Sequence, residues 1–203
     1  MCDLDGVVRH FDPVRQAEIE ARFGLPAGTI STLALDPPLL QPAIIGAVAD
    51  ETWRASVASA LRLRWPSVDA DAAVAAWSAS PGTPDEQVVA LVRRVRQRVP
   101  VLALTNATTR LRSDLARAGL DGVFDRVVSS AEVGHAKPSA PVFRAAQEAA
   151  AEVLGCAVLE PEQILYVDDS PGHVAGAAAL GWTAVTFEGP QQLATVLRTS
   201  GLL

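Results

Sequence analysis

The sequence is poor in cysteine, in aromatic side chains and in long apolar runs. Its 203 residues include two cysteines, Cys2 and Cys156, which form neither a disulfide framework nor a cysteine metal cluster. No apolar run reaches the ~18 residues of a membrane helix, and the first residues do not have the layout of a secretory signal. These absences predict a soluble, cytoplasmic protein with no membrane partner.

Positive charge is also scarce, and the formal net charge is −6. The basic residues form no block of their own. Arg93, Arg94, Arg96 and Arg98 alternate with apolar residues, as on the solvated face of a helix. A nucleic-acid partner is therefore not expected.

Hydrophobic residues make up 49% of the chain, which is enough for a sizeable core. After Pro81, short apolar runs alternate with segments of helical pattern. Strands are expected at 101–104, 123–128, 164–167 and 182–187. Helices are expected at 83–98, up to Gly119, at 140–154, before Gly181 and from about Gln191. This alternation predicts an α/β fold, a Rossmann-like doubly wound parallel sheet covered by helices on both faces.

The segment 13–80 reads differently, as helices rich in alanine and leucine. Asp12 followed by Pro13 predicts a helix start, and further helices are expected at about 50–65 and 70–78. The proline-rich stretch 35–42 is not expected to form a continuous helix. Thr83 to Glu86 reads as a capping box that opens the next helix.

The strand that should precede Asp3 is very short, because only Met1 and Cys2 come before it. Strands of fewer than three residues are rare. Either a short stub suffices for the fold, or the natural first strand begins further upstream.

Polar side chains gather where the expected strands end. Ligands bind outside the carboxyl ends of the strands in open parallel sheets. The polar residues at or next to these ends are Asp3 and Asp5, Thr105 and Asn106, Lys137 in a loop before a helix, and Asp168 with Asp169. Each group alone is common as a turn, a helix cap or a surface lysine, but their joint occurrence in this order points to a site.

The chemistry of this set suits phosphoryl transfer. A carboxylate that faces a phosphate dianion is repelled unless a divalent cation neutralises the charge, and oxygen ligands suit Mg²⁺. A hydroxyl and an ammonium group can hold the remaining phosphate oxygens. A second carboxylate can protonate the leaving group and then activate water.

Four segments together resemble the motif set of the haloacid dehalogenase superfamily. They are Asp3-Leu4-Asp5-Gly6-Val7, Thr105-Asn106, Gly134-His135-Ala136-Lys137-Pro138 and Val167-Asp168-Asp169-Ser170. The resemblance spans the chain, and the set of four is highly specific.

The resemblance implies a role for each residue. Asp3 would be the nucleophile that becomes phosphorylated, and Asp5 the general acid and base. Thr105 and Asn106 would bind the phosphoryl group, and Lys137, expected in an exposed loop, would balance the negative charge. Asp3, Asp169 and the Asp5 backbone carbonyl would bind Mg²⁺, with Asp168 as a direct or water-bridged partner.

The resemblance also implies two domains, an α/β core formed by residues 1–12 and 81–203 and a helical cap formed by residues 13–80, inserted after the first strand. The spacing is similar to that of small sugar-phosphate phosphatases and of the phosphatase domain of epoxide hydrolases. The expected activity is Mg²⁺-dependent hydrolysis of a small phosphorylated metabolite.

Other readings stay open. A phosphosugar mutase keeps both aspartates and differs in its cap, and a receiver-like or non-catalytic binding protein would use a similar acidic cluster. A 2-haloacid dehalogenase is less favoured, because that branch lacks the second aspartate, which is Asp5 here. The identity of the substrate, and whether the protein is a monomer or a homodimer, are not determined by the sequence.

Overall fold

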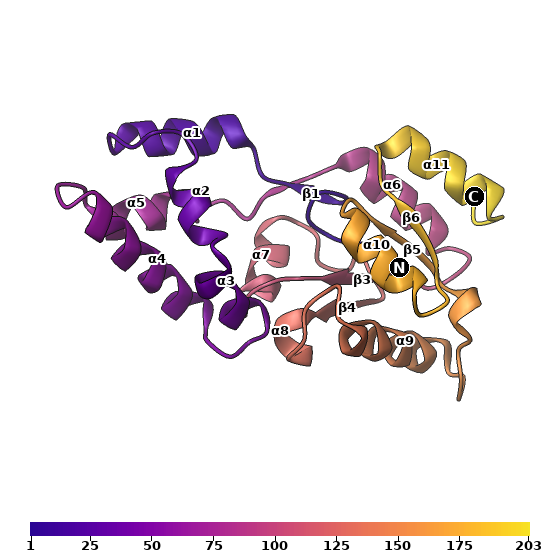
Figure 1. Cartoon of the computed structure of the whole chain (residues 1–203). Helices are drawn as coiled ribbons and strands as arrows, with labels where there is room; N and C mark the ends of the chain where they lie inside the picture. Colours follow the sequence, from indigo (N-terminus) through magenta and orange to yellow (C-terminus); the bar gives the residue numbers. More distant parts are fainter.

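The chain folds into two lobes, one α/β and one helical, joined by two connecting segments (Figure 1). The structure is a computed structural model that describes residues 1–203. None of its helices is long and apolar enough to cross a membrane. The helical lobe contains α1 (Pro13–Arg22), α2 (Thr29–Ala34), α3 (Pro37–Ile44), α4 (Asp50–Arg64) and α5 (Ala70–Trp77).

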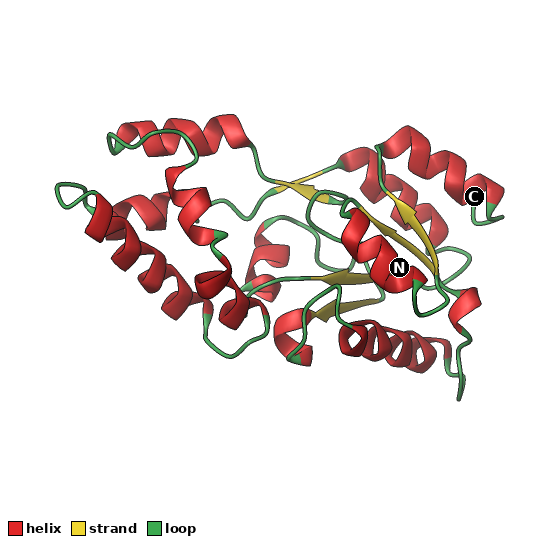
Figure 2. Ribbon diagram, viewed as in Figure 1, coloured by secondary structure: helices red, strands yellow, loops and turns green.

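The α/β lobe follows the alternation that the sequence predicts (Figure 2). Its parallel strands are β3 (Leu102–Thr105), β4 (Arg126–Ser129), β5 (Leu165–Asp168) and β6 (Thr183–Thr186). Its helices are α6 (Glu86–Val95), α7 (Leu111–Arg117), α8 (Ser130–Val133), α9 (Ala140–Leu154), the short 3-10 helix η1 (Pro161–Gln163), α10 (Pro171–Ala178) and α11 (Pro190–Thr199).

The first residues form the centre of the sheet, although they are too few to make a regular strand. Cys2 pairs in parallel with Ala103 on one side and with Val167 on the other. The backbone N–H of Cys2 donates to the Leu102 carbonyl at 3.0 Å, and the N–H of Asp3 donates to the Val167 carbonyl at 2.8 Å. With β3 paired to β4 and β5 paired to β6, the sheet order is β4, β3, the Met1–Asp3 segment, β5, β6. The predicted doubly wound fold class is confirmed.

Side chains alternate between the two faces of this sheet, and each face has its own apolar cluster. Ala103 belongs to the cluster beneath α6, α7 and α11, whereas its neighbours Leu102 and Leu104 belong to the cluster beneath α9 and α10. Successive strand residues point to opposite faces, so a continuous apolar run fills both cores. The buried strands fix the positions of the polar residues at their ends.

The helical lobe has a separate hydrophobic cluster, built around Ile30, Val57 and Leu61. Trp53 belongs to it and is 8% exposed, while Trp65 and Trp77 pack against it only partly buried. A cluster that includes no side chain from the sheet indicates that this lobe is stabilised largely by its own packing.

The proline-rich stretch 35–42 is not a continuous helix, as predicted, because α2 ends at Ala34 and α3 begins at Pro37. Pro37 and Pro38 occupy the first turn of α3, whose N–H groups have no partners within the helix. One local prediction was wrong. The capping residue of α6 is Asp85, not Thr83. The Asp85 carboxylate accepts from two N–H groups of the first turn, and residues 83–84 form a strand instead.

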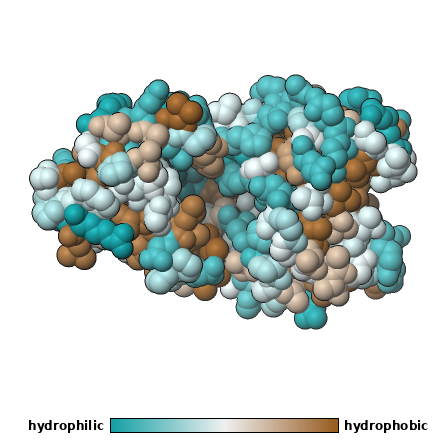
Figure 3. Space-filling model, turned by 45° about the horizontal axis from the view of Figure 1, so that its top comes forward, coloured by the Kyte–Doolittle hydropathy of each residue, from teal (hydrophilic) through white to brown (hydrophobic).

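The two lobes are joined by a small antiparallel pair, β1 (Arg9–His10) with β2 (Thr83–Pro84). Arg9 pairs with Pro84, and His10 pairs with Thr83. The space-filling view shows the two lobes on either side of a constriction (Figure 3). The chain therefore leaves and re-enters the α/β lobe at one place. The exit follows closely after Asp3 and Asp5.

Candidate active site

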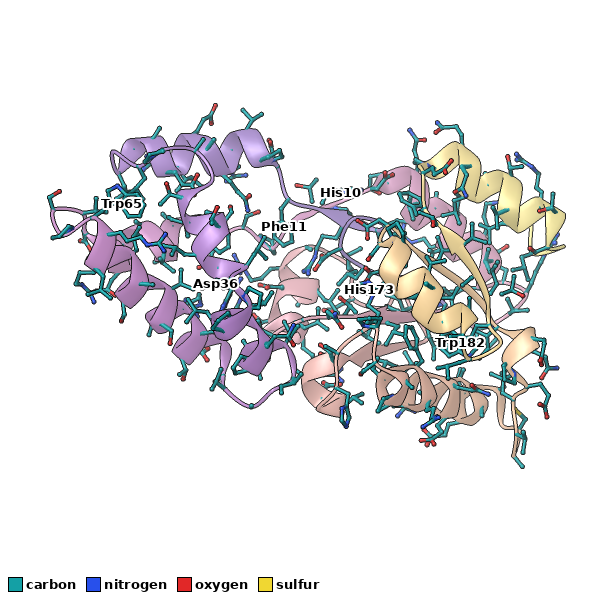
Figure 4. All side chains as sticks on the ribbon, in the orientation of Figure 1. His10, Phe11, Asp36, Trp65, His173 and Trp182 are labelled. Atoms are coloured by element: carbon teal, nitrogen blue, oxygen red, sulfur yellow. The ribbon has the colours of Figure 1, made fainter.

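The carboxyl ends of three neighbouring strands bring the predicted polar residues together. Asp3 ends the central segment, Thr105 is the last residue of β3, and Asp168 is the last residue of β5. All three are buried. Figure 4 shows His173, from the start of α10, on the side of the α/β lobe that faces the helical lobe. The candidate site therefore lies between the two lobes.

Lys137 links the two buried carboxylates. Its Nζ lies 2.8 Å from Asp3 Oδ1 and 2.7 Å from Asp168 Oδ2, and its side chain has no exposed surface. Lys137 lies in a loop whose residues Gly134 and Pro138 are exposed, as predicted, but its own side chain points into the protein and is buried. Lys137 is also the only lysine of the chain. A compact ammonium group with three donors can contact two carboxylates at once.

Asn106 fixes the backbone of Lys137. Its side-chain oxygen accepts from the Lys137 N–H at 2.8 Å, and its amide nitrogen donates to the Lys137 carbonyl at 3.0 Å. Such a pair of bonds holds the lysine loop in one register. In this geometry Asn106 orients Lys137. A direct contact between Asn106 and a phosphate group stays a prediction.

Asp168 accepts hydrogen bonds from several directions. Lys137 and the Tyr166 hydroxyl both donate to its Oδ2, and the backbone N–H of Ser170 donates to its Oδ1 at 2.8 Å. His173 Nδ1 lies 3.1 Å from Oδ1. Burial opposes ionisation of this carboxyl, but the bonds from His173, Lys137 and Tyr166 outweigh it and hold its pKa well below the usual range. Asp168 is therefore an anion that anchors its neighbours.

Asp3 has the opposite electrostatic character. Burial raises the pKa of its carboxyl to about 7, against the positive charge of Lys137. The negative charge of Asp168 adds to the rise, while the backbone N–H of Leu4, which donates to Oδ1 at 2.7 Å, opposes it. One lysine does not fully balance two buried carboxylates, so the site favours an additional cation.

The hydroxyl group of Thr105 is buried and has no hydrogen-bond partner. A buried polar group without a partner is costly, and in a native protein it calls for an explanation. A phosphoryl oxygen would supply the missing partner at the end of β3, so this orphaned hydroxyl fits the predicted role of Thr105.

The residues that could hold a divalent cation offer hard oxygen donors, as magnesium prefers. Asp169 is exposed, and no hydrogen bond or ion pair of the structure uses its carboxylate. It lies directly over Gly6, where an added Cβ would come within 2.2 Å of Asp169 Oδ2. Asp3 and Asp169 thus fit as ligands, whereas the oxygens of Asp168 are already engaged. The potential ligand atoms of His173, Asp3 and Asp168 all lie within 4.8 Å of one another.

Asp5 points away from this cluster, toward Arg9. The two side chains form a double hydrogen bond, with Arg9 Nε 2.6 Å from Asp5 Oδ1 and Arg9 Nη2 3.0 Å from Asp5 Oδ2. The Asp5 side chain is 36% exposed, so it lies at the edge of the site. The structure does not bring its carboxylate into contact with Lys137 or Asp168, and its role in acid–base chemistry stays a prediction.

Comparison with known proteins decides the family. A family model described as haloacid dehalogenase-like hydrolase matches residues 2–181. This chain belongs to the haloacid dehalogenase-like hydrolases. An uncharacterized hydrolase of Schizosaccharomyces pombe is 33% identical over 82 residues, which are 40% of this chain and 36% of that relative. The chain therefore matches little more than a third of the length of that relative.

Solved structures of the family share the fold of this hydrolase. A family enzyme of Bacteroides thetaiotaomicron, BT-2542, in complex with magnesium and inorganic phosphate, is 19% identical with a TM-score of 0.70, and the match covers 91% of each chain. The L-2-haloacid dehalogenase RSc1362 is 21% identical with a TM-score of 0.67, covering 92% of this chain and 84% of the other. At these identities the likeness shows the fold alone.

Sequence reasoning missed three side chains of the site: Tyr166, His173 and Arg9. Tyr166 stands two positions before Asp168 on β5, so the two side chains share a face of the sheet, and this spacing was a usable signal. His173 stands in the first turn of α10, near Asp168. Arg9 stands four residues after Asp5, but a turn and not a helix lies between them, and its other bond is to Pro81, so the local pattern does not reveal its contacts.

A Mg²⁺ site that includes Asp3 should bind the ion more weakly as the pH falls below about 7. A carboxylate must lose its proton to bind a metal, and the pKa of Asp3 in the metal-free protein is raised to about 7. Below that pH the apparent dissociation constant for Mg²⁺ should rise by about tenfold per pH unit. Calorimetric titration with MgCl₂ between about pH 5.5 and pH 8 measures this.

The same titration in buffers of different ionisation enthalpy should show proton release below about pH 7. Asp3→Asn removes the titrating group and should abolish both the release and the pH dependence. A wild-type affinity that stays constant over this range would contradict a metal site that includes Asp3.

Proposed function

We propose that this hydrolase is a magnesium-dependent phosphatase that cleaves a small phosphorylated metabolite, such as a sugar phosphate, through a phosphorylated Asp3. The observation that carries the proposal is the second carboxylate, Asp5, which stands two residues after Asp3 with its side chain 36% exposed. An alkoxide leaving group needs a proton as its bond to phosphorus breaks, whereas a halide does not.

In the first step an Asp3 oxygen attacks phosphorus, and the bond between phosphorus and the leaving oxygen breaks. Asp5 gives its proton to that oxygen, so the products are an aspartyl phosphate and an alcohol. In the second step Asp5 takes a proton from water as the water attacks phosphorus. Inorganic phosphate leaves and Asp3 is restored.

The other residues hold the phosphoryl group and balance charge. Thr105 donates its hydroxyl proton to a phosphoryl oxygen, and Lys137 offsets the charge that gathers near Asp3. Asp3 and Asp169 would hold Mg²⁺, which when bound neutralises the repulsion between the carboxylate and the phosphate dianion. Asp168, itself held by Tyr166 and His173, keeps Lys137 in place through their direct contact.

We also propose that residues 13–80 act as a cap domain that selects the substrate. Two contacts support a defined closed arrangement. The Thr108 hydroxyl donates to Asp50 Oδ1 at 2.7 Å, and the N–H of Asp50 donates to Thr109 Oγ1 at 3.0 Å. Asp50 begins α4 in the helical lobe, and the two threonines follow Thr105 closely. A contact at this point connects the helical lobe to the loop of the phosphate site.

Phosphate release from a panel of phosphorylated metabolites, with and without Mg²⁺, tests the proposal. We expect release only with Mg²⁺, and no chloride release from 2-chloropropionate, which tests the dehalogenase alternative. Isomerised phosphosugar without free phosphate would instead show a mutase. Chloride release without phosphate release would contradict the proposed phosphatase, and no turnover of any compound would favour the binding-protein alternative.

A further inference from the structure

Arg9 buries a full positive charge against the proposed acid–base residue. Its side chain is 4% exposed, and its guanidinium contacts each oxygen of the Asp5 carboxylate with a separate nitrogen. A paired arrangement of this kind fixes the plane of the carboxylate as well as its distance. A tight turn sets the partners close together, because the N–H of Gly6 donates to the Arg9 carbonyl at 2.9 Å.

The third nitrogen of the guanidinium contacts the segment that leads from the helical lobe back to the α/β lobe. Arg9 Nη1 donates to the Pro81 carbonyl at 3.1 Å. The next residue, Gly82, has a φ of +81°, and a Cβ at that position would lie 2.6 Å from Arg9 Cγ. On another side the Phe11 ring centre is 5.2 Å from Arg9 Cζ (Phe11 is labelled in Figure 4). Both connections between the lobes therefore hold Arg9.

We propose that Arg9 is a positioning residue that sets the orientation of the Asp5 carboxylate for proton transfer to the leaving group. The inference rests on the proposed phosphatase activity. A carboxylate has about four lone-pair sites, and the two bonds from Arg9 use one on each oxygen. The Asp5 side chain is 36% exposed, so its carboxylate keeps accessible surface for a further partner. Arginine keeps its charge and has no acceptor atom, so Arg9 transfers no proton itself.

The positioning role has a kinetic signature that differs from a purely structural one. A misplaced acid slows a substrate that needs protonation, such as a sugar phosphate, more than 4-nitrophenyl phosphate, whose leaving group hardly needs it. If Arg9 acts through Asp5, removing Arg9 should also have no further effect once Asp5 has lost its acid group. A purely structural defect would slow both substrates equally and would add to any other change.

The experiment is a double-mutant cycle with Arg9→Met, Asp5→Asn and the double variant, followed by single-turnover rates of phosphoryl transfer with Mg²⁺. The substrates are 4-nitrophenyl phosphate and the best sugar phosphate of the panel. We expect Arg9→Met to slow the sugar phosphate by about 10²-fold and the aryl phosphate by less than about tenfold. In the Asp5→Asn background Arg9→Met should change either rate by less than about twofold.

Arg96 offers a matched control. Its guanidinium forms the same pair of hydrogen bonds with the Asp125 carboxylate, and its third nitrogen also donates to a backbone carbonyl. Arg96 lies at the opposite end of the strands, where Asp125 accepts a hydrogen bond from the Val101 N–H. Arg96→Met should leave both rates unchanged. Arg9→Lys serves if Arg9→Met does not fold. The lysine keeps a charge without the paired contact, and it should show a smaller loss with the same bias toward the sugar phosphate.

The outcomes separate the inference from the function on which it rests. Equal losses of rate for both substrates, or rate losses that multiply in the double variant, would overturn the role of Arg9. Mg²⁺-dependent phosphate release by the wild type would leave the phosphatase proposal intact in that case. A wild type that releases no phosphate from any substrate would overturn the proposed function, and the role of Arg9 with it.

Discussion

Asp3→Asn is expected to lower the rate of phosphate release by roughly 10⁴-fold or more while the protein stays folded. An amide has no anionic oxygen with which to attack phosphorus, so the proposed covalent intermediate cannot form. The change in size is small, and the amide oxygen can still accept the hydrogen bond from the Leu4 N–H. The loss should therefore come from the chemistry and not from the packing.

Single-turnover phosphate release and thermal unfolding, measured on the same preparation, separate these two causes. Asp121→Asn is the matched control, because Asp121 is exposed and lies in a turn outside the site. Mass spectrometry of the acid-quenched wild type should place the phosphoryl group on the peptide that contains Asp3. Near-normal turnover by a homogeneous Asp3→Asn protein would rule out Asp3 as the nucleophile.

The positions of Asp3, Thr105 and Asp168 could be predicted because each depends on a local pattern. An apolar run of strand length followed by a polar residue indicates both the strand and its end, and parallel strands bring such ends together. The α/β fold class follows from the same alternation. These features need no knowledge of which segments meet across the molecule.

The burial of Lys137 and the pairing of Asp5 with Arg9 could not be predicted in this way. Lys137 stands between small and polar residues, which is the usual setting of an exposed lysine, and only the fold of its loop over the sheet removes it from water. Arg9 stands only four residues after Asp5, but the segment between them is a turn and not a helix, so the spacing alone predicts no contact. Arg9 also donates to the carbonyl of Pro81, which is far away in the sequence. Electrostatic partners contributed by distant segments carry no periodic signal, so the tertiary structure alone reveals them.

Lys137→Met is expected to remove most of the activity and to destabilise the metal-free protein by about 3–5 kcal/mol near neutral pH. The lysine contacts Asp3 and Asp168, whose side chains are 8% and 0% exposed. Methionine fills a similar volume but brings no charge, so two carboxylates would lie unpaired in the interior. Chemical denaturation without metal measures the free energy of unfolding.

The pH dependence of this loss distinguishes charge from packing. Without Lys137 the pKa values of the two buried carboxyl groups should be raised, so the folded variant binds more protons than the unfolded chain. Under that condition the free energy of unfolding increases as the pH falls. The destabilisation should therefore shrink between about pH 7 and pH 5 as the unpaired carboxylates are protonated. A deficit caused by lost packing would stay constant over this range.

Arg126→Met is the matched control for the removal of a positive charge, since Arg126 forms an ion pair with Glu152 on the surface, with side chains 47% and 65% exposed. Exposed pairs of this kind contribute at most about 1 kcal/mol. Saturating Mg²⁺ should restore part of the stability of Lys137→Met, because a cation between Asp3 and Asp169 replaces some of the missing positive charge, but it should not restore turnover. A Lys137→Met protein with normal stability and normal phosphate release would contradict the role of this lysine as the buried counter-charge of the site.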